Sequence, residues 1–141
     1  MKLKIKHLPT IFLGLLLFGC QADSRQQILA ADKSQVALRA AQSRVLDTTN
    51  RSLSMRTVIA TLQDLGFTVD KVDRDIGVVS ATKAADYLMK MTVSVRQRGN
   101  DQVVVRASAQ HNLKAVSDAA PYQQFFNALE QAVFLENNAS N

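Results

Sequence analysis

The side chains able to do nucleophilic, acid–base or metal chemistry are few in this chain. It has one cysteine, Cys20, and two histidines, of which only His111 lies beyond residue 7. This inventory excludes a disulfide framework within the chain and a Cys/His zinc site. A serine or threonine nucleophile with an imidazole base would have to use His111, which ends a predicted strand. We interpret His111 as a surface-loop histidine rather than a catalytic base.

Three acidic residues, Asp70, Asp73 and Asp75, flank a predicted turn. Acids at this spacing could gather calcium or supply an acid/base pair. A calcium loop needs further ligands and a closing glutamate, however, and Lys71 and Arg74 stand among these three residues. We interpret them as turn formers. The glycines do not form a phosphate-binding loop, because they are scattered at Gly14, Gly19, Gly66, Gly77 and Gly99. We therefore expect no catalytic residue, no metal site and no enzymatic activity.

The chemistry of Cys20 depends on the residues before it. Met1–His7 is basic and contains no acid, and Ile11–Phe18 is an apolar run. That run is shorter than the roughly 20 residues of a stable membrane anchor, and it fits a secretory signal peptide over residues 1–19. The stretch Leu17-Phe18-Gly19-Cys20 resembles the lipobox of bacterial lipoproteins, although Phe18 is larger than the residue usual at that position.

The lipoprotein resemblance implies cleavage between Gly19 and Cys20. It also implies a diacylglycerol thioether on the Cys20 thiol and an acyl chain on the new amino group, with no other cofactor. Two or more buried chains hold a protein stably on a membrane. In enteric lipoproteins an aspartate directly after the cysteine retains the protein in the inner membrane, whereas here that residue is Gln21. The resemblance thus implies a lipid-anchored protein of the outer membrane that faces the periplasm.

The formal net charge of +5 comes from 17 basic and 12 acidic residues. Three of the basic residues precede Gly19, so from residue 20 onward the count is 14 basic to 12 acidic. If the Val36–Asp47 segment joins the sheet, several basic residues are expected to share its outer face, from the set Arg39, Arg44, Lys90, Arg96 and Arg106. An acidic partner or lipid head group could meet Lys90, Arg96 and Arg106; the alternative is a solvated polar face. No aromatic residue lies among them, so a nucleic-acid partner is not expected.

The clearest predicted element is a helix after the cap formers of Asp47–Asn50. Met55, Val58, Ile59, Leu62 and Leu65 make one apolar stripe along it. Gly66 is predicted to end this helix in the left-handed conformation. Residues 20–35 are expected to be a tether, in which a short helix over Arg25–Leu29 is possible. Val36–Asp47 is ambiguous between helix and strand; we favour a strand that completes the sheet.

Four strands are predicted after the first helix, over residues 67–72, 76–82, 89–96 and 102–110. Gly77 is expected to form a bulge, and Arg98–Asp101 a hairpin turn. Strict alternation directs the side chains Met89, Met91, Val93, Val95, Val103, Val105, Ala107 and Ala109 into the core. A last helix is predicted to start near Ser117 or Asp118. Its apolar face carries Tyr122, Phe125, Phe126, Leu129 and Val133, and residues 137–141 are expected to be a disordered tail.

These elements predict one α+β domain over residues 36–136, in the order β-α-β-β-β-β-α. The expected fold is a curved antiparallel sheet with helices packed on one face. Its topology resembles the helix-grip domains of some envelope lipoproteins. In addition, Leu46–Asn50, Ala60–Phe67 and Val78–Lys83 resemble segments of a family of small, functionally uncharacterised bacterial lipoproteins.

We expect a non-enzymatic accessory or scaffold subunit of a cell-envelope assembly, with an unidentified envelope protein as partner. The alternative is a periplasmic module that holds a lipid or hydrophobic small molecule between helix and sheet, beside Tyr122, Phe125 and Phe126. The aromatic stripe motivates this alternative, although such stripes commonly fill a core.

Overall fold

The computed structural model describes residues 21–85 and 87–139. The described chain divides between Gln35 and Val36 into two units, and each is considered by itself. In the first unit the described residues are helical and form most of α1 (Gln21–Ala41). The helix therefore extends well beyond the short Arg25–Leu29 segment expected from the sequence. The helix formers Ala, Leu, Gln, Lys and Arg dominate its sequence, and it contains no glycine or proline.

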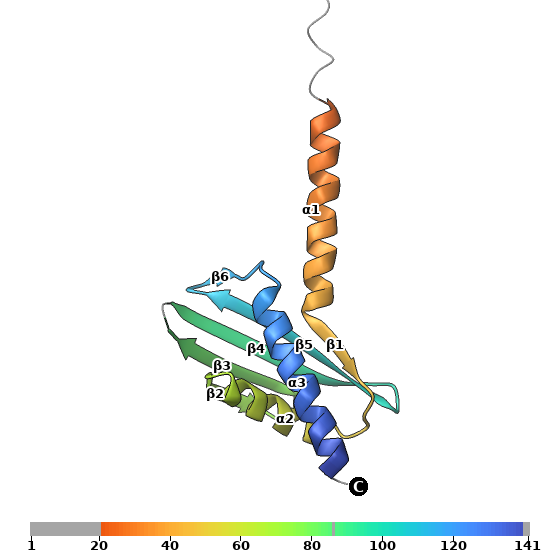
Figure 1. Ribbon diagram of the computed structural model, residues 1–141, viewed down its shortest axis with the longest axis vertical. Coiled ribbons are helices and arrows are strands. Elements are labelled where there is room, and N and C mark those ends of the chain that lie inside the picture. The colour runs from red at the N-terminus through yellow and green to blue at the C-terminus, as the bar shows by residue number, and fades with distance from the viewer. Residues whose placement is uncertain (1–20, 86, 140–141) are drawn as a thin grey trace, which may run out of the picture. The chain divides into compact units, whose positions relative to one another are not determined.

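The second unit is an antiparallel sheet with two helices on one of its faces (Figure 1). Its elements are β1 (Ser43–Leu46), α2 (Arg51–Asp64), β2 (Thr68–Asp73), β3 (Val78–Ala84), β4 (Leu88–Arg98), β5 (Gln102–His111), β6 (Lys114–Ala115) and α3 (Ala120–Ala139). The strands lie in the order β1-β5-β4-β3-β2, and β6 pairs with β5. The predicted α+β class, with an antiparallel sheet covered on one face, is confirmed.

The core lies between the sheet and the two helices, and it follows the predicted alternation. Met91, Val93 and Val95 of β4 are buried, whereas Met89 is only partly buried. The core residues predicted on β5 are buried as well, and they are Val103, Val105, Ala107 and Ala109. The helices contribute Met55, Val58, Leu62, Tyr122, Phe125, Phe126 and Leu129.

Both ends of α2 are closed as its sequence predicts. At the start, the Asn50 side chain accepts a hydrogen bond from the backbone N–H of Leu53 at 2.9 Å, which satisfies one of the free donors of the first turn. At the end, Gly66 adopts φ +82°. The N–H of Phe67 then reaches the carbonyl of Leu62 at 2.9 Å, the bond that defines this glycine-dependent helix stop.

The strand expected over Val36–Asp47 is wrong for its first half. Residues 36–41 are the end of α1, and only Ser43–Leu46 form a strand. The alternation of apolar residues suggested a strand, but Leu38 and Ala41 are three apart and both pack against the core. That spacing is helical, and the alanine content supports it. Ser43–Leu46 does join the sheet beside β5, where a partner strand was expected.

Three smaller expectations also need correction. Gly77 is not a bulge: it lies in the turn between β2 and β3 with φ +70°, and the irregular pairing falls between Val69 and Lys71. The two-residue strand β6 was not expected. It returns after Asn112 and Leu113, which both have positive φ. Helix α3 continues to Ala139, so residues 137–139 are helical rather than a disordered tail.

Candidate functional site

The face of the sheet opposite α2 and α3 is polar. Along β4 the residues that alternate with the core are Lys90, Thr92, Ser94 and Arg96, and along β5 they include Arg106, Ser108 and Gln110. All of these are half-buried or exposed, whereas the core-facing residues 91, 93 and 95 of β4 and 103, 105, 107 and 109 of β5 are buried. The polar face is therefore uncovered by the two helices, as a one-sided antiparallel sheet requires.

The three predicted contact residues do not form one cluster. Arg106 pairs with Ser94, and Arg96 pairs with Val104, so the two arginines are diagonal neighbours, a relation that places residues about 7–8 Å apart. Lys90 pairs instead with Thr82 and Gln110. It precedes Arg96 by six positions along β4, a separation of about 20 Å in an extended strand. The structure thus brings Arg96 and Arg106 together and leaves Lys90 at the other end of the face.

A hollow of about 380 Å³ opens on this polar face beside Arg106. It exists because β1 begins only at Ser43, which pairs with Arg106. The chain before it turns away as Gln42, whose carbonyl accepts the N–H of Ala107 at 2.9 Å, and then as the last turn of α1. Arg39 on that turn forms part of the wall. The full lining is Arg39, Gln42, Ser43, Thr92, Ser94, Arg106, Ala107 and Ser108.

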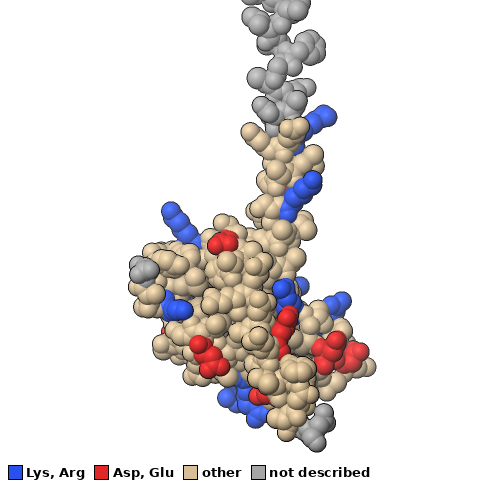
Figure 2. Space-filling view, in the orientation of Figure 1, with Lys and Arg blue, Asp and Glu red and all other residues tan. Residues whose placement is uncertain are grey.

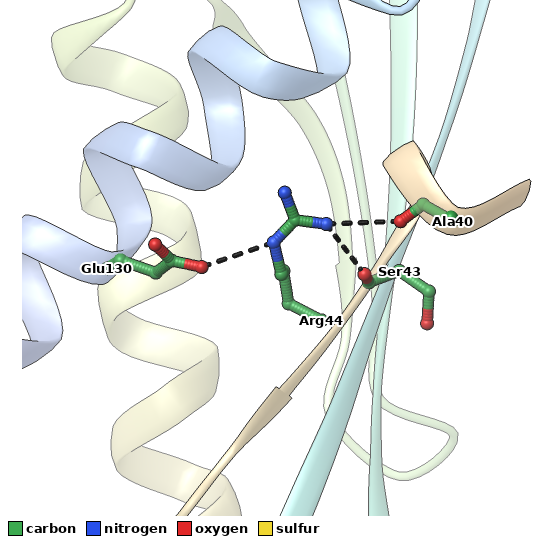
Figure 3. Close-up of polar contacts among 4 residues, drawn as sticks. All are labelled: Ala40, Ser43, Arg44 and Glu130. Atoms are coloured by element: carbon green, nitrogen blue, oxygen red, sulfur yellow. Dashed lines mark hydrogen bonds and ion pairs between the residues drawn. The ribbon is translucent and has the colours of Figure 1, made fainter. Parts of the chain in front are cut away.

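Arg44, one of the basic residues considered for the outer face, does not share it. Its Nε lies 3.2 Å from Oε1 of Glu130 on α3, and its Nη1 donates to the carbonyls of Ala40 and Ser43 (Figure 3). The guanidinium also lies 5.0 Å from the centre of the Phe126 ring. Arg44 therefore fastens β1 to α3 on the helix side of the sheet.

Arg51 is likewise engaged within the fold. Its guanidinium donates to the carbonyls of Val95, Arg74 and Asp75 at 3.0–3.2 Å. Arg39, Arg96 and Arg106 differ, since none of them has a hydrogen bond or ion pair within residues 25–85 and 87–139. The arginines of the polar face are thus available to a ligand or partner, whereas Arg44 and Arg51 hold elements of the fold together.

The acidic residues that suggested a calcium or acid/base site make local contacts instead. Asp70 accepts a hydrogen bond from the hydroxyl of Thr82 at 2.6 Å, and Asp73 accepts one from the N–H of Ile76 at 3.2 Å. Asp73 thus makes a contact typical of a turn former, whereas Asp70 lies within β2 and contacts the neighbouring strand β3. Across the described residues, no group of three His, Cys, Asp or Glu side chains is placed to hold a metal ion.

His111 ends β5 on the helix side of the sheet, where its ring makes an edge contact with Tyr87 at 4.2 Å between centroids. Its Nδ1 is buried and has no hydrogen-bond partner in the described chain. It is therefore half-buried against an aromatic ring rather than in an open surface loop, which sequence alone did not indicate.

The aromatic face of α3 fills the core. Tyr122, Phe125 and Phe126 are each at most 1% exposed, and the Phe125 and Phe126 rings meet at 5.0 Å. A groove of about 390 Å³ does open between helix and sheet, but at the first turn of α3 and away from Phe125. It is lined by Leu65, Phe67, Lys83, Ala85, Tyr87, Met89, Met91, Asp118, Ala120, Pro121 and Gln124.

The side of the second unit that carries α2 and α3 has acidic and basic groups interspersed over a largely uncharged surface (Figure 2). Small groups of mixed sign do not create a field that would steer a charged partner. Charge complementarity therefore contributes little to partner recognition on the helix side. The hollow, with its two arginines, lies on the other face of the sheet.

The predicted lipidation and cleavage residues, Cys20 and Gly19, lie outside the described residues. Among the helices that are described, none combines the length and apolarity needed to cross a membrane. No known protein family matches the chain, and no curated protein matches it in sequence.

Proposed function

We propose that this protein is a lipid-anchored, non-enzymatic accessory or scaffold subunit of a cell-envelope assembly, and that its polar sheet face is the partner contact surface. The observation that carries the proposal is the uncovered face itself. Most of its side chains are hydroxyls, amides and basic groups, and Arg96 and Arg106 are not engaged by other described residues. The helices cover most of the other face of the sheet, whereas the polar face is open to a partner.

The lipobox-like sequence before Cys20 supports the location in this proposal, with the domain on the periplasmic side of the outer membrane. A lipid anchor confines the domain to a membrane surface and so raises its effective concentration near an envelope partner. The net charge after residue 19 is small, so complementarity would act locally, through individual arginines, rather than through a long-range field.

Site-specific photo-crosslinking of the full-length protein in its own host tests the proposal. The crosslinking amino acid replaces Lys90 or Gln110 on the polar face, and the matched controls carry it at Gln123 or Asn127, which are exposed on α3. We expect one recurrent envelope protein to be captured from the polar-face positions only. Equal capture from α3, or no recurrent adduct from the polar face, would contradict the proposed contact surface.

A second candidate function is a module that holds an apolar small molecule, and the groove at the start of α3 favours it. A volume of about 390 Å³ falls within the range of small-molecule sites. Native mass spectrometry of protein from its host should then show a bound mass. Ala85→Trp, which fills the groove, should lose that mass, and Ala60→Trp on the exposed side of α2 should keep it. A wild-type protein without any bound mass would set this candidate aside.

A further inference from the structure

We propose that the hollow beside Arg106 binds the phosphate group of a ligand. The inference rests on the proposed function for the role of the polar face as a contact surface, and it adds the chemistry that this surface recognises. The lining of the hollow comes from this chain alone, so phosphate binding can be measured without a protein partner. Its residues come from the end of α1, from β1, and from the centres of β4 and β5.

The first argument is uncompensated positive charge. Arg39 and Arg106 both line the hollow, no carboxylate does, and neither guanidinium is paired within the described residues. Each guanidinium carries five N–H donors in a planar fork that matches the oxygens of an oxyanion. Arg96 is the diagonal neighbour of Arg106 on the same face, and so adds to the positive potential at the rim.

The second argument is the arrangement of hydroxyl groups around Arg106. The pairing places Ser43 of β1 on one side of Arg106 and Ser94 of β4 on the other. The next pair of residues along the same face is Thr92 and Ser108. Four hydroxyl side chains therefore line the hollow with the two arginines. The Ser108 hydroxyl donates to the Thr92 carbonyl at 3.5 Å, and the Thr92 hydroxyl lies 3.4 Å from that of Ser80. The hydroxyls of Ser43 and Ser94 have no such contact in the described chain and can donate to a ligand. Because strands fix the spacing of these groups, the donors are held in place before a ligand arrives.

The number of donors selects phosphate over a carboxylate. A phosphate monoester carries a charge of about −1.5 to −2 at neutral pH and presents three acceptor oxygens, which two guanidinium groups and the hydroxyls of Ser43 and Ser94 can satisfy together. A carboxylate has two oxygens and a single charge, and would leave one arginine uncompensated. The volume of about 380 Å³ also leaves room for a small group attached to the phosphate.

The experiment is calorimetric titration of the full-length protein in non-ionic detergent. The probes are inorganic phosphate, glycerol phosphate and acetate at constant ionic strength, and micelles that do or do not carry phosphatidic acid. We expect a phosphate-bearing probe to bind and acetate to bind more weakly. Binding to the free phosphates identifies a soluble ligand class, and binding to phosphatidic acid alone identifies a lipid head group. Both results support the site if they depend on the arginines.

The variants establish that dependence. Arg39→Gln and Arg106→Gln should each weaken binding by about tenfold or more, because a charge-assisted bidentate contact is lost. Arg106→Lys keeps the positive charge and should retain part of the phosphate affinity that Arg106→Gln loses. Arg56→Gln on α2 removes the same charge from an exposed site that does not line the hollow, and should leave binding almost unchanged. Binding that survives both hollow variants, an equal loss in Arg56→Gln, or no phosphate binding by the wild type would overturn the inference.

This outcome is separable from that of the crosslinking experiment. Phosphate binding that depends on Arg39 and Arg106, with no partner captured in cells, would retain the site and reject the accessory-subunit role. A captured partner without phosphate binding would retain the accessory-subunit role and reject the phosphate site.

Discussion

At Gly77 the backbone of the turn between β2 and β3 passes directly against β4. Its carbonyl accepts the N–H of Val95 at 2.8 Å, and its φ is +70°. A Cβ built at this position would collide with the backbone carbonyl of Val95 and with the guanidinium of Arg51. Glycine is thus required here twice, for the conformation and for the space.

Gly77→Ala should therefore lower the free energy of unfolding by about 3 kcal/mol, as the sum of positive-φ strain and the displaced contacts. Gly99→Ala is the matched control, since φ there is +63° but the nearest atom to an added Cβ is 3.8 Å away. It should cost only about 1 kcal/mol. Urea unfolding of both variants measures the difference. Equal losses would show that conformation alone, without crowding, sets the cost.

Tyr122 acts through its hydroxyl as well as its ring. The hydroxyl donates to the carbonyl of Val116 at 2.9 Å and accepts the N–H of Ala109 at 3.2 Å, and the side chain is 1% exposed. These bonds join α3, β5 and the segment between them.

Tyr122→Phe keeps the ring and leaves two buried backbone groups without a partner, so it should cost about 2–3 kcal/mol in unfolding free energy. Tyr87→Phe removes a hydroxyl from a half-exposed residue whose oxygen has no hydrogen bond in the described chain. It should change stability by less than about 0.5 kcal/mol. Thermal or urea unfolding compares the two, and a stability unchanged by Tyr122→Phe would refute the bridging role.

At the scale of elements, the end of α1 belongs to the second unit. Leu38 and Ala41 pack against the core, and the Gln42 carbonyl bonds to the N–H of Ala107. The same residues position Arg39 at the hollow. The last turn of α1 therefore serves both the stability of the domain and the candidate phosphate site.

A truncated chain that begins at Val36 should unfold at the same urea concentration as one that begins at Gln21. A chain that begins at Ser43 should lose about 2–4 kcal/mol, because a half-buried leucine and a backbone hydrogen bond are removed. Amide exchange at Ala107 gives a local readout and should accelerate in the shorter chain. Equal stability of the chains beginning at Val36 and Ser43 would show that α1 contributes nothing to the core.

At the scale of the whole molecule, the proposed location depends on the single cysteine. Cys20→Ser should move the protein from the membrane fraction to the soluble fraction, or leave an unprocessed precursor, because no thiol remains to carry the lipid. Two acyl chains stabilise membrane attachment by about 0.8 kcal/mol for each buried CH₂, so the change should be nearly complete. Fractionation with labelled fatty acid measures it. A membrane fraction unchanged by Cys20→Ser, or a wild type that takes up no labelled fatty acid, would reject lipidation.

Local signals in the sequence were sufficient for most elements. The Asn50 cap, the Gly66 stop and the alternation along β4 and β5 each depend on neighbours within a few positions, and each was confirmed. The Val36–Asp47 segment was partly wrong because its alternation and its alanine content favour different structures. Only tertiary packing resolves such a conflict, because it stabilises the helical conformation in which Leu38 and Ala41 pack against the core.

The candidate site could be predicted from the sequence only in part. The sequence by itself determined the α+β class, the core face of each long strand and the presence of Arg96 and Arg106 on the outer face. Only the tertiary structure decided that Arg44 turns to Glu130, that Lys90 stands apart, and that Arg39 joins Arg106 at a hollow lined with hydroxyls. The physical reason is that these placements depend on which distant segments pair, and the local pattern of one strand specifies its buried face but not its neighbours in the sheet.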